Sequence, residues 1–302
     1  MVEHSFGGPW TERKLRCLRD YLKAYRTIFT GNQKARYFST WYVDAFAGTG
    51  SRTPTRPAGS TLERFFADAY DYDDAEAAAE AKEYQDGSAK IALGLSSPFD
   101  NYLFIEKSKT RVAELQSAIQ AGFPLLYPRC HFREGDANTE LRGWCAARNW
   151  NKERAVVFLD PYGMQVEWTT IETLAATKGV DLWYLFPGIA RLLRRDGNID
   201  EAWQKRLDIL LGTDTWRTRF FQTRQRHGLF GDFEEVQRDV TEQAIQEFIH
   251  ERLETCFGKK KVAKGLILRN SKASPLYFLC FAASNDRGAG PALKIANSIL
   301  DD

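Results

Sequence analysis

Hydrophobic and polar residues alternate with two different periods along most of the chain. Apolar residues recur at helical spacing between Trp10 and Thr30, and the run YFSTWYVDAF at 37–46 is rich in aromatic and β-branched side chains. The first pattern predicts an amphipathic helix and the second a strand. The same reasoning predicts, in chain order, a helix at 88–95, a strand at 102–106, a helix at 109–121, a strand end at 130–136, a helix at 138–148, a strand at 155–159, a helix at 168–177 and a strand at 182–186.

Strands that alternate with helices of this length predict a parallel sheet with right-handed crossovers. The continuous apolar run at 155–159 is typical of a central strand that is buried on both faces. Two further strand-like runs, at 265–269 and 276–283, are joined by a polar link short enough for an antiparallel hairpin. We therefore expect an α/β fold with a doubly wound, mostly parallel sheet and a C-terminal antiparallel hairpin. The hairpin favours the Rossmann-like order of class I methyltransferases over a pure dinucleotide-binding order.

The pattern divides the chain into four segments. We expect an N-terminal helical segment at 1–36, an α/β core at 37–188, a helical insertion or cap at 189–258, and a terminal β-hairpin at 259–302 that completes the core sheet. The acidic, alanine-rich stretch at 64–84 is interpreted as a solvated helix or mobile loop; the alternative is a lid whose acidic face meets a partner.

Composition excludes several classes of protein. With 302 residues and 43% hydrophobic content the chain can bury a sizeable core, so it is neither disordered nor fibrous. A net charge of +2 does not by itself predict a nucleic-acid or membrane partner, so such binding would need a local patch. The beginning of the chain lacks the apolar core of a signal peptide, and no run approaches the roughly 18 to 20 apolar residues of a membrane helix. Five scattered cysteines without a CxxC and four scattered histidines predict neither a metal site nor a disulfide framework, and we expect a cytoplasmic protein.

Ligands of doubly wound sheets bind at the carboxyl ends of the strands. The first predicted strand ends in DAFAGTG (44–50), where two glycines allow a tight turn and a close approach to a ligand, although the spacing departs from GxGxxG. The second ends in Glu106, which can accept hydrogen bonds from the ribose hydroxyls of an adenosine-containing cofactor or can pair with Lys107 or Lys109. The third is followed by Asp136, which can accept the adenine amino group or cap the next helix.

The fourth predicted strand runs into Asp160-Pro161-Tyr162-Gly163. Proline fixes the backbone, so the carboxylate and the flanking carbonyl point into the cleft together. A planar exocyclic amine can donate to both and stack on Tyr162, which holds the nitrogen lone pair toward an incoming methyl group and makes positioning the main source of catalysis. The alternative is a tight turn with a capping aspartate.

Segments along most of the chain, from about Trp10 to Ser284, resemble the three-Cys-motif partner protein family, whose members are similar to class I methyltransferases. The segments that carry the resemblance are GPWTERKLRCLRDYLKAY (8–25), YVDAFAGTG (42–50), DGSAKIAL (86–93), YLFIEKSKTRVAEL (102–115), GDAN (135–138), VVFLDPYG (156–163), DLWYLFP (181–187) and LYFLCFAAS (276–284).

The resemblance implies S-adenosylmethionine as cofactor, with Asp44, Gly48 and Gly50 beside its methionine part, Glu106 at the ribose and Asp136 at the adenine. The full set of cofactor-binding residues that we expect is Asp44, Phe46, Gly48, Gly50, Glu106, Lys107, Asp136 and Ala137. Asp160, Pro161 and Tyr162 occupy the place of the catalytic amino-methyltransferase motif. They depart from its DPPY form, because a single proline is present and glycine follows the aromatic residue. The tetrapeptide is similar to that of tRNA guanine-N2 methyltransferases, which implies a nucleic-acid base as substrate. The family name implies a separate partner protein that bears three cysteines.

Three functions remain open. The first is an S-adenosylmethionine-dependent methyltransferase that modifies an amino group of a nucleic-acid base, and the second is a non-catalytic adaptor with the same fold that docks its partner. A nicotinamide-dependent oxidoreductase is third, since Glu106 also suits the ribose of NAD, but no catalytic His or Tyr-xxx-Lys arrangement is present. The absence of GxxxxGK[ST] excludes a P-loop nucleoside triphosphatase.

Arginine beside aromatic residues suits phosphate contact and base stacking, although a helical subdomain with an aromatic core and solvated arginines has the same composition. The residues of this kind are Arg52 and Arg56 after the glycine turn, and Arg191, Arg194, Arg195, Trp203, Trp216, Arg217, Arg219, Phe220, Phe221, Arg224 and Arg226 in the insertion.

Overall fold

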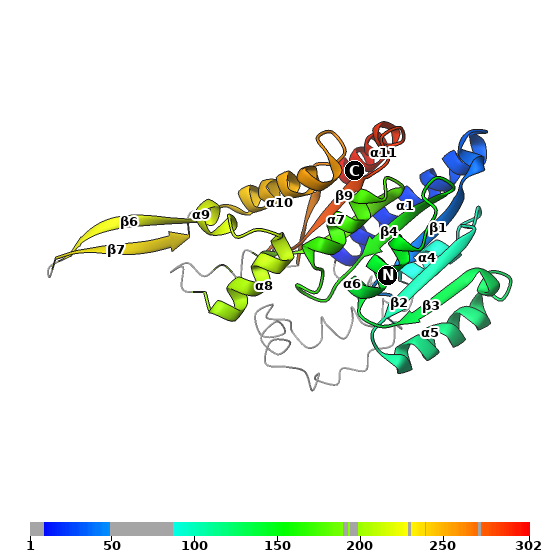
Figure 1. The fold of residues 1–302 in the computed structure, drawn as a ribbon, viewed down its shortest axis with the longest axis horizontal. Helices are drawn as coiled ribbons and strands as arrows, with labels where there is room; N and C mark the ends of the chain where they lie inside the picture. Colours follow the sequence, from blue (N-terminus) through cyan, green and yellow to red (C-terminus); the bar gives the residue numbers. More distant parts are fainter. Residues whose placement is uncertain are drawn as a thin grey trace, which may run out of the picture.

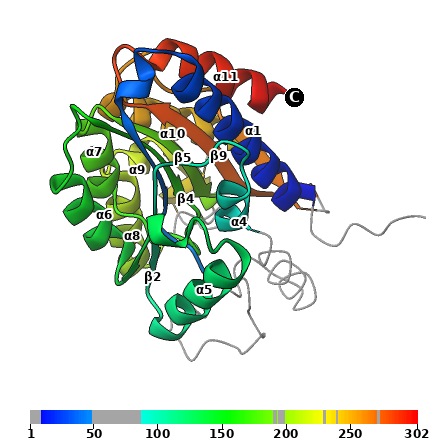
Figure 2. The same ribbon diagram turned by 90° about the vertical axis from the view of Figure 1, so that its right-hand side faces the viewer.

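The structure is a computed structural model that describes residues 9–48, 87–189, 193, 199–228, 231–238, 240–270 and 273–302. Its centre is a seven-stranded sheet with helices on both faces (Figures 1 and 2). The strands follow the order β3-β2-β1-β4-β5-β9-β8 across the sheet. Their bounds are β1 Ser39–Asp44, β2 Asn101–Glu106, β3 Cys130–Glu134, β4 Glu153–Leu159, β5 Val180–Pro187, β8 Leu266–Arg269 and β9 Pro275–Ala283.

Strands β1 to β5 pair in parallel, whereas β9 is antiparallel to both β5 and β8. This confirms the predicted mixed α/β sheet with its C-terminal antiparallel hairpin. From β1 the chain moves outward to β2 and β3, and then crosses back to β4 on the other side of β1. The strand order therefore reverses between β1 and β4, which is the place where such sheets bind ligands.

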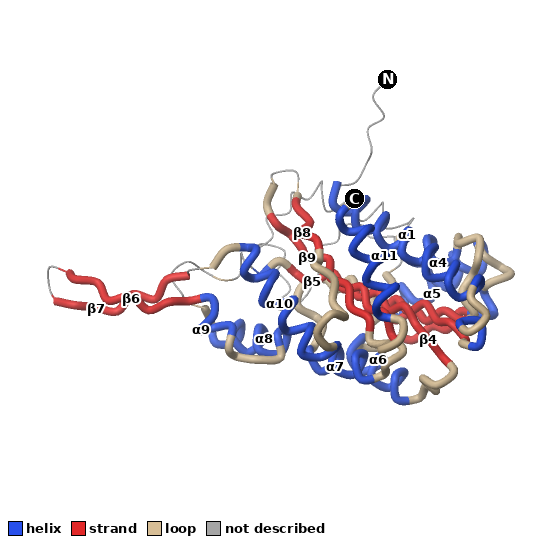
Figure 3. The backbone as a smooth tube through the Cα atoms, turned by 90° about the horizontal axis from the view of Figure 1, so that it is seen from above, coloured by secondary structure: helices blue, strands red, loops and turns tan. Residues whose placement is uncertain are grey.

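Helices cover the sheet in two layers, which Figure 3 shows from above. Helix α1 packs against α4 and α11, and on the opposite face α7 contacts α6, α8 and α10. Their bounds, with those of the remaining helices, are α1 Pro9–Gly31, α4 Ser88–Leu93, α5 Lys109–Gly122, α6 Ala137–Ala146, α7 Trp168–Ala176, α8 Glu201–Leu211, α9 Trp216–Phe220, α10 Glu242–Phe257 and α11 Ala289–Asp301.

The apolar stripe of α1 explains how this helix is held on the sheet. Leu18, Leu22 and Tyr25 are buried at the helical spacing that the sequence predicts, and Tyr21 is buried beside them. The Tyr21 ring lies 5.3 Å from that of Trp183 in β5 and 4.8 Å from that of Phe281 in β9. In the part of the chain that the structure describes, no helix combines the length and apolar character needed to cross a membrane.

The insertion at 189–258 is not wholly helical, and that prediction is wrong over its middle. Besides α8, α9 and α10 it contains an antiparallel hairpin of β6 (Phe221–Gly228) and β7 (Gly231–Arg238), which projects from the body in Figure 1. Two runs of equal length that meet at glycines are a hairpin signal, and the abundance of arginine and glutamine obscured it. Helix α11, which follows the terminal hairpin, is also an addition to the predicted elements. The division into four segments stays a prediction.

Gly212 fixes the junction of α7, α8 and α10. It ends α8 at a φ of +64°, and a Cβ on it would come within 2.2 Å of the Trp168 side chain. The Arg252 guanidinium donates to the carbonyls of Leu211 and Gly212 and covers the Trp168 ring.

Gly212→Ala is therefore expected to lower the free energy of unfolding by about 3 kcal/mol, through backbone strain and overpacking. Urea unfolding measures this change. Gly290→Ala is the matched control, because a Cβ there meets nothing within 4 Å in helix α11. Equal stability of the two variants would contradict this account of the junction.

Candidate active site

Four acidic residues lie at the carboxyl ends of four adjacent strands. Asp44 ends β1, Glu106 ends β2, Asp136 follows β3 and Asp160 follows β4. The register aligns these ends, since Asp44 is opposite both Phe104 of β2 and Phe158 of β4. The structure thus confirms that the predicted strand ends share one edge of the sheet. Backbone bonds join the turns beyond them, namely Ala45 N to Phe158 O at 3.2 Å, Ala47 N to Ile105 O at 3.0 Å and Gly135 N to Glu106 O at 3.2 Å.

Asp44 is fully buried and is bonded within the chain. Its carboxylate accepts hydrogen bonds from the Ser88 hydroxyl, from Phe46 N at 3.3 Å and from the Tyr42 hydroxyl at 3.4 Å. Burial raises the pKa of Asp44 to about 6; the bond from Ser88 opposes this rise and the charge of Asp160 adds to it. These contacts tie the end of β1 to the start of α4 and to the turn that contains Phe46.

The raised pKa of Asp44 predicts a pH-dependent contribution to stability. Between its ordinary value of 3.8 and about 6, folded Asp44 holds a proton that the unfolded chain releases. The free energy of unfolding therefore falls as pH rises through this window, by up to about 3 kcal/mol from this group. Asp44→Asn removes the contribution, so its stability relative to the wild type is expected to increase from pH 4 to pH 7 in urea unfolding. A difference that stays constant with pH would contradict the assignment.

Gly48, in the turn after β1, adopts a φ of +50°, and among the described residues a Cβ there would meet only the Phe46 carbonyl, at 4.0 Å. The backbone at this point is therefore open to close approach, as the glycine turn predicts. Gly50 lies outside the described residues, as do Arg52, Arg56 and the 64–84 stretch.

Glu106 is 9% exposed and is held at the turn between β2 and α5. Its Oε1 accepts hydrogen bonds from Ser108 N at 2.9 Å and from the Arg111 guanidinium at 3.4 Å. Among the described residues its ion pair is with Arg111, rather than with Lys107 or Lys109. The carboxylate is thus oriented before any ligand arrives.

Asp136 caps helix α6, as one of its two predicted roles requires. Its Oδ1 accepts hydrogen bonds from Asn138 N and Thr139 N, both at 3.1 Å. The residue is exposed, Ala137 beside it is buried, and no hydrogen bond to Oδ2 comes from the described residues. The cap fixes the carboxylate and leaves one oxygen for an external donor.

Asp160 forms an ion pair with Lys14 of α1, whose Nζ lies 2.8 Å from its Oδ2. The Lys14 side chain is fully buried and that of Asp160 is 5% exposed. Tyr162 is 37% exposed, and Gly163 completes the turn at a φ of +74°. The turn therefore directs the carboxylate inward and leaves the tyrosine ring at the surface. Lys14 was not among the residues predicted from the sequence, although a lysine within the apolar stripe of the first helix was the signal that could have revealed it.

Two of the aromatic residues predicted for the insertion, Trp216 and Phe220, are buried, and two others, Trp203 and Phe221, are partly buried against the core. Arg217 and Arg219 pair with Asp208 and Glu251. These aromatic residues agree with the alternative of a subdomain with an aromatic core, and the two arginines are paired outside it. Arg191, Arg194 and Arg195 lie outside the described residues, and the side chains of Arg224 and Arg226 are likewise not described.

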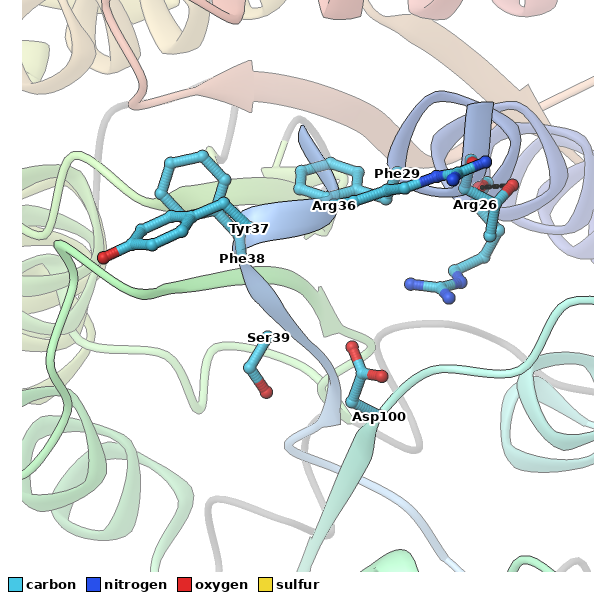
Figure 4. A pocket seen from close by; sticks show the side chains of 8 residues that line it. Arg26, Phe29, Arg36, Tyr37, Phe38, Ser39 and Asp100 are labelled. Atoms are coloured by element: carbon cyan, nitrogen blue, oxygen red, sulfur yellow. Dashed lines mark hydrogen bonds between the residues drawn. The ribbon is translucent and has the colours of Figure 1, made fainter. Parts of the chain in front are cut away.

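A cavity of about 520 Å³ lies at the opposite edge of the sheet, at the amino ends of β1 and β2 (Figure 4). The polar groups there bind one another, since Arg26 donates to the Thr40 hydroxyl and Thr40 donates to Asp100 through its amide and its hydroxyl. Because ligands of such sheets bind at the carboxyl edge, we assign the candidate site to the four strand ends. The cavity is lined by Arg26, Phe29, Thr30, Arg36, Tyr37, Phe38, Ser39 and Asp100.

The strand order and the terminal antiparallel hairpin define a Rossmann-like fold of the class I methyltransferase type. No family model and no curated protein matches the chain. Similar solved structures include protein LPL1258 from Legionella pneumophila, with 14% identity over 84% of this chain and 94% of that one at a TM-score of 0.38. Another is a "putative S-adenosylmethionine dependent methyltransferase from Listeria monocytogenes", with 10% identity over 89% and 99% at 0.35. A third is "Putative methyltransferase yhhF from Escherichia coli", with 14% identity over 74% and 86% at 0.29. Because all three TM-scores are below 0.5, the fold assignment rests on the strand order of this chain.

Proposed function

We propose that this chain is an S-adenosylmethionine-dependent methyltransferase that modifies an exocyclic amino group of a nucleic-acid base. The observation that carries the proposal is the Asp160 carboxylate, nearly buried beside the reversal of strand order and followed by Pro161 and an exposed Tyr162. An acceptor beside a surface-exposed ring suits a planar amine better than it suits a hydroxyl or an aliphatic carbon.

The strand ends fit the chemistry of the proposed cofactor. A ribose diol and an adenine amino group are hydrogen-bond donors, and Glu106 and Asp136 are acceptors that their own turns already orient. The open backbone at Gly48 lies between them and Asp160 in the strand order. When bound, S-adenosylmethionine supplies an electrophilic methyl group on a sulfonium. We assign Asp44 to the support of the β1 turn, because its hydrogen bonds lie within the chain.

The chain's own contribution to transfer is positioning. Asp160 accepts a hydrogen bond from the amino group, and Tyr162 stacks on the base, so the nitrogen lone pair is held in line for attack. The nitrogen would form its bond to the methyl carbon as the methyl–sulfur bond breaks and a neutral thioether leaves. The nearby carboxylate would stabilise the positive charge that the nitrogen gains, until the nitrogen releases its proton to solvent. Neither step requires a metal. In the part of the chain that the structure describes, no three His, Cys, Asp or Glu side chains are grouped to hold one.

A partner protein bearing three cysteines is part of the proposal on the strength of the sequence resemblance alone. A non-catalytic adaptor is the second candidate, and the projecting β6–β7 hairpin favours it by offering a surface away from the strand ends. The adaptor hypothesis predicts that a substitution of Asp160 leaves intact the function that depends on docking of the partner protein.

The function can be tested by incubating the chain with methyl-labelled S-adenosylmethionine and separate pools of tRNA, ribosomal RNA and duplex DNA. Digestion to nucleosides and mass spectrometry then identify the methylated atom. We expect label on an exocyclic nitrogen of one base. Label on carbon, on oxygen or on protein would contradict the assignment of the substrate, and binding of the cofactor without transfer to any pool would favour the adaptor.

A further inference from the structure

We infer that Lys14 is a positioning residue that holds the Asp160 carboxylate in place for the reaction. The inference rests on the proposed function, because Asp160 is assigned there to the amino group. Lys14 acts through Asp160 and not on the substrate directly. It comes from a helix outside the strand ends that form the rest of the site.

Helix α1 runs across the sheet so that its first turns lie at the carboxyl edge. The Trp10 ring lies 5.0 Å from that of Tyr277, and Tyr277 pairs with Pro187, the last residue of β5. The opposite end of the helix supplies Phe29 and Thr30 to the cavity at the amino edge. Lys14 is therefore carried to the end of β4 by the packing of the whole helix.

Burial makes each charge of the pair dependent on the other. The Lys14 side chain is fully buried, that of Asp160 is almost so, and the Lys14 Nζ also lies 5.1 Å from the centre of the Trp10 ring. A buried carboxylate without a cation tends to take up a proton, because the charged form loses its hydration.

Asp44, one strand away, shows what this environment does without a cation. Among the described residues it has no ion pair, and burial together with the charge of Asp160 raises its pKa to about 6. The ion pair with Lys14 is a contact that Asp160 makes and that Asp44 does not make among the described residues.

The pair is poorly explained as a device for stability. A well-packed apolar pair of similar volume is often as stable as a buried ion pair, since burying two charges costs most of what their attraction returns. Since stability alone does not explain the buried Lys14–Asp160 pair, we attribute the pair to the chemistry of the site.

A double-mutant cycle tests the inference. Lys14→Met keeps the stem of the side chain and removes its charge, Asp160→Asn keeps an acceptor without a charge, and the double variant combines them. Transfer is measured with the nucleic-acid pool that the wild type methylates, and the dissociation constant of S-adenosylmethionine is measured in parallel. Lys23→Met, at an exposed position on α1, is the matched control and should behave as the wild type.

We expect Lys14→Met to lower kcat about a hundredfold, as misplacement of a positioned group does, with a change in cofactor affinity below about threefold. In the chain that already carries Asp160→Asn, Lys14→Met should lower kcat by no more than about threefold, because the two side chains act as a unit. The urea midpoint gives a readout that is independent of transfer. Lys14→Met should lower this midpoint, and adding Asp160→Asn should restore part of it. If Lys14→Met does not fold, Lys14→Gln replaces it throughout the cycle.

Equal losses of kcat on both backgrounds, or a Lys14→Met variant with wild-type kcat, would overturn the inference while the proposed function stands. A wild-type chain that binds S-adenosylmethionine and methylates none of the pools would overturn both.

Discussion

Replacing Asp160 with alanine is expected to lower the rate of methyl transfer by about 1,000-fold while the affinity for S-adenosylmethionine changes little. The substitution removes the acceptor that holds the amino group and the charge that stabilises the nitrogen as its new bond forms, a loss comparable with that of an oxyanion-hole donor. The proposed cofactor-binding residues Gly48, Glu106 and Asp136 are untouched. Single-turnover transfer and equilibrium dialysis with labelled cofactor measure the two quantities separately.

Asp160→Ala also leaves the buried Lys14 without its partner, which can cost about 3–5 kcal/mol of stability. Asp160→Asn is the control for this effect, because the amide keeps an acceptor for the Lys14 ammonium. We expect it to lose less stability than Asp160→Ala and to retain part of the activity. Methyl transfer by a folded Asp160→Ala variant at the wild-type rate would show that Asp160 takes no part in the reaction. It would favour the alternative interpretation of the DPYG sequence as a tight turn with a capping aspartate.

Replacing Glu106 with alanine is expected to weaken S-adenosylmethionine binding at least about 100-fold. Two hydrogen bonds from ribose hydroxyls to a carboxylate are each worth roughly 1.5–3 kcal/mol, and every 1.4 kcal/mol is tenfold in affinity. Since the Glu106 carboxylate is already oriented by Ser108 N and Arg111, the ligand spends little free energy on ordering it. Equilibrium dialysis with labelled S-adenosylmethionine measures the effect.

Glu172→Ala, on the exposed side of α7, is the matched control and should leave the dissociation constant unchanged. Glu106→Ala also loses local bonds at the start of α5, so its melting temperature must be compared with that of the control. A folded Glu106→Ala variant with wild-type affinity would place the cofactor elsewhere.

The sheet could be predicted because its strands carry their own signals. The apolar run from Ala155 to Leu159 has the pattern of a buried strand whatever its position in the fold. Helix α1 shows an apolar stripe at Leu18, Tyr21 and Leu22. The arrangement of the strands in the sheet was predicted from the alternation of strands and helices and from the short link before β9. The β6–β7 hairpin was missed because its polar strands form no part of the central core, so no apolar face marks them.

The residues of the candidate site that lie at strand ends could be predicted from the sequence. The contacts between residues that are far apart in the sequence could not. Asp136 remained ambiguous because a cap and a ligand acceptor require the same residue at the same position. Lys14 and Asp160 lie 146 residues apart in the chain, and only the packing of α1 on the sheet brings them together. The burial of Asp44 likewise depends on α4, through Ser88, as well as on its own strand.

The proposed function requires that S-adenosylmethionine binds at the carboxyl edge of the sheet, and calorimetric titration of the wild-type chain is the sharpest test of this binding. We expect one site per chain with a roughly micromolar dissociation constant, competition by S-adenosylhomocysteine, and no heat with NAD. Absence of binding at millimolar S-adenosylmethionine would contradict the methyltransferase and leave the adaptor. Binding of NAD in its place would revive the oxidoreductase.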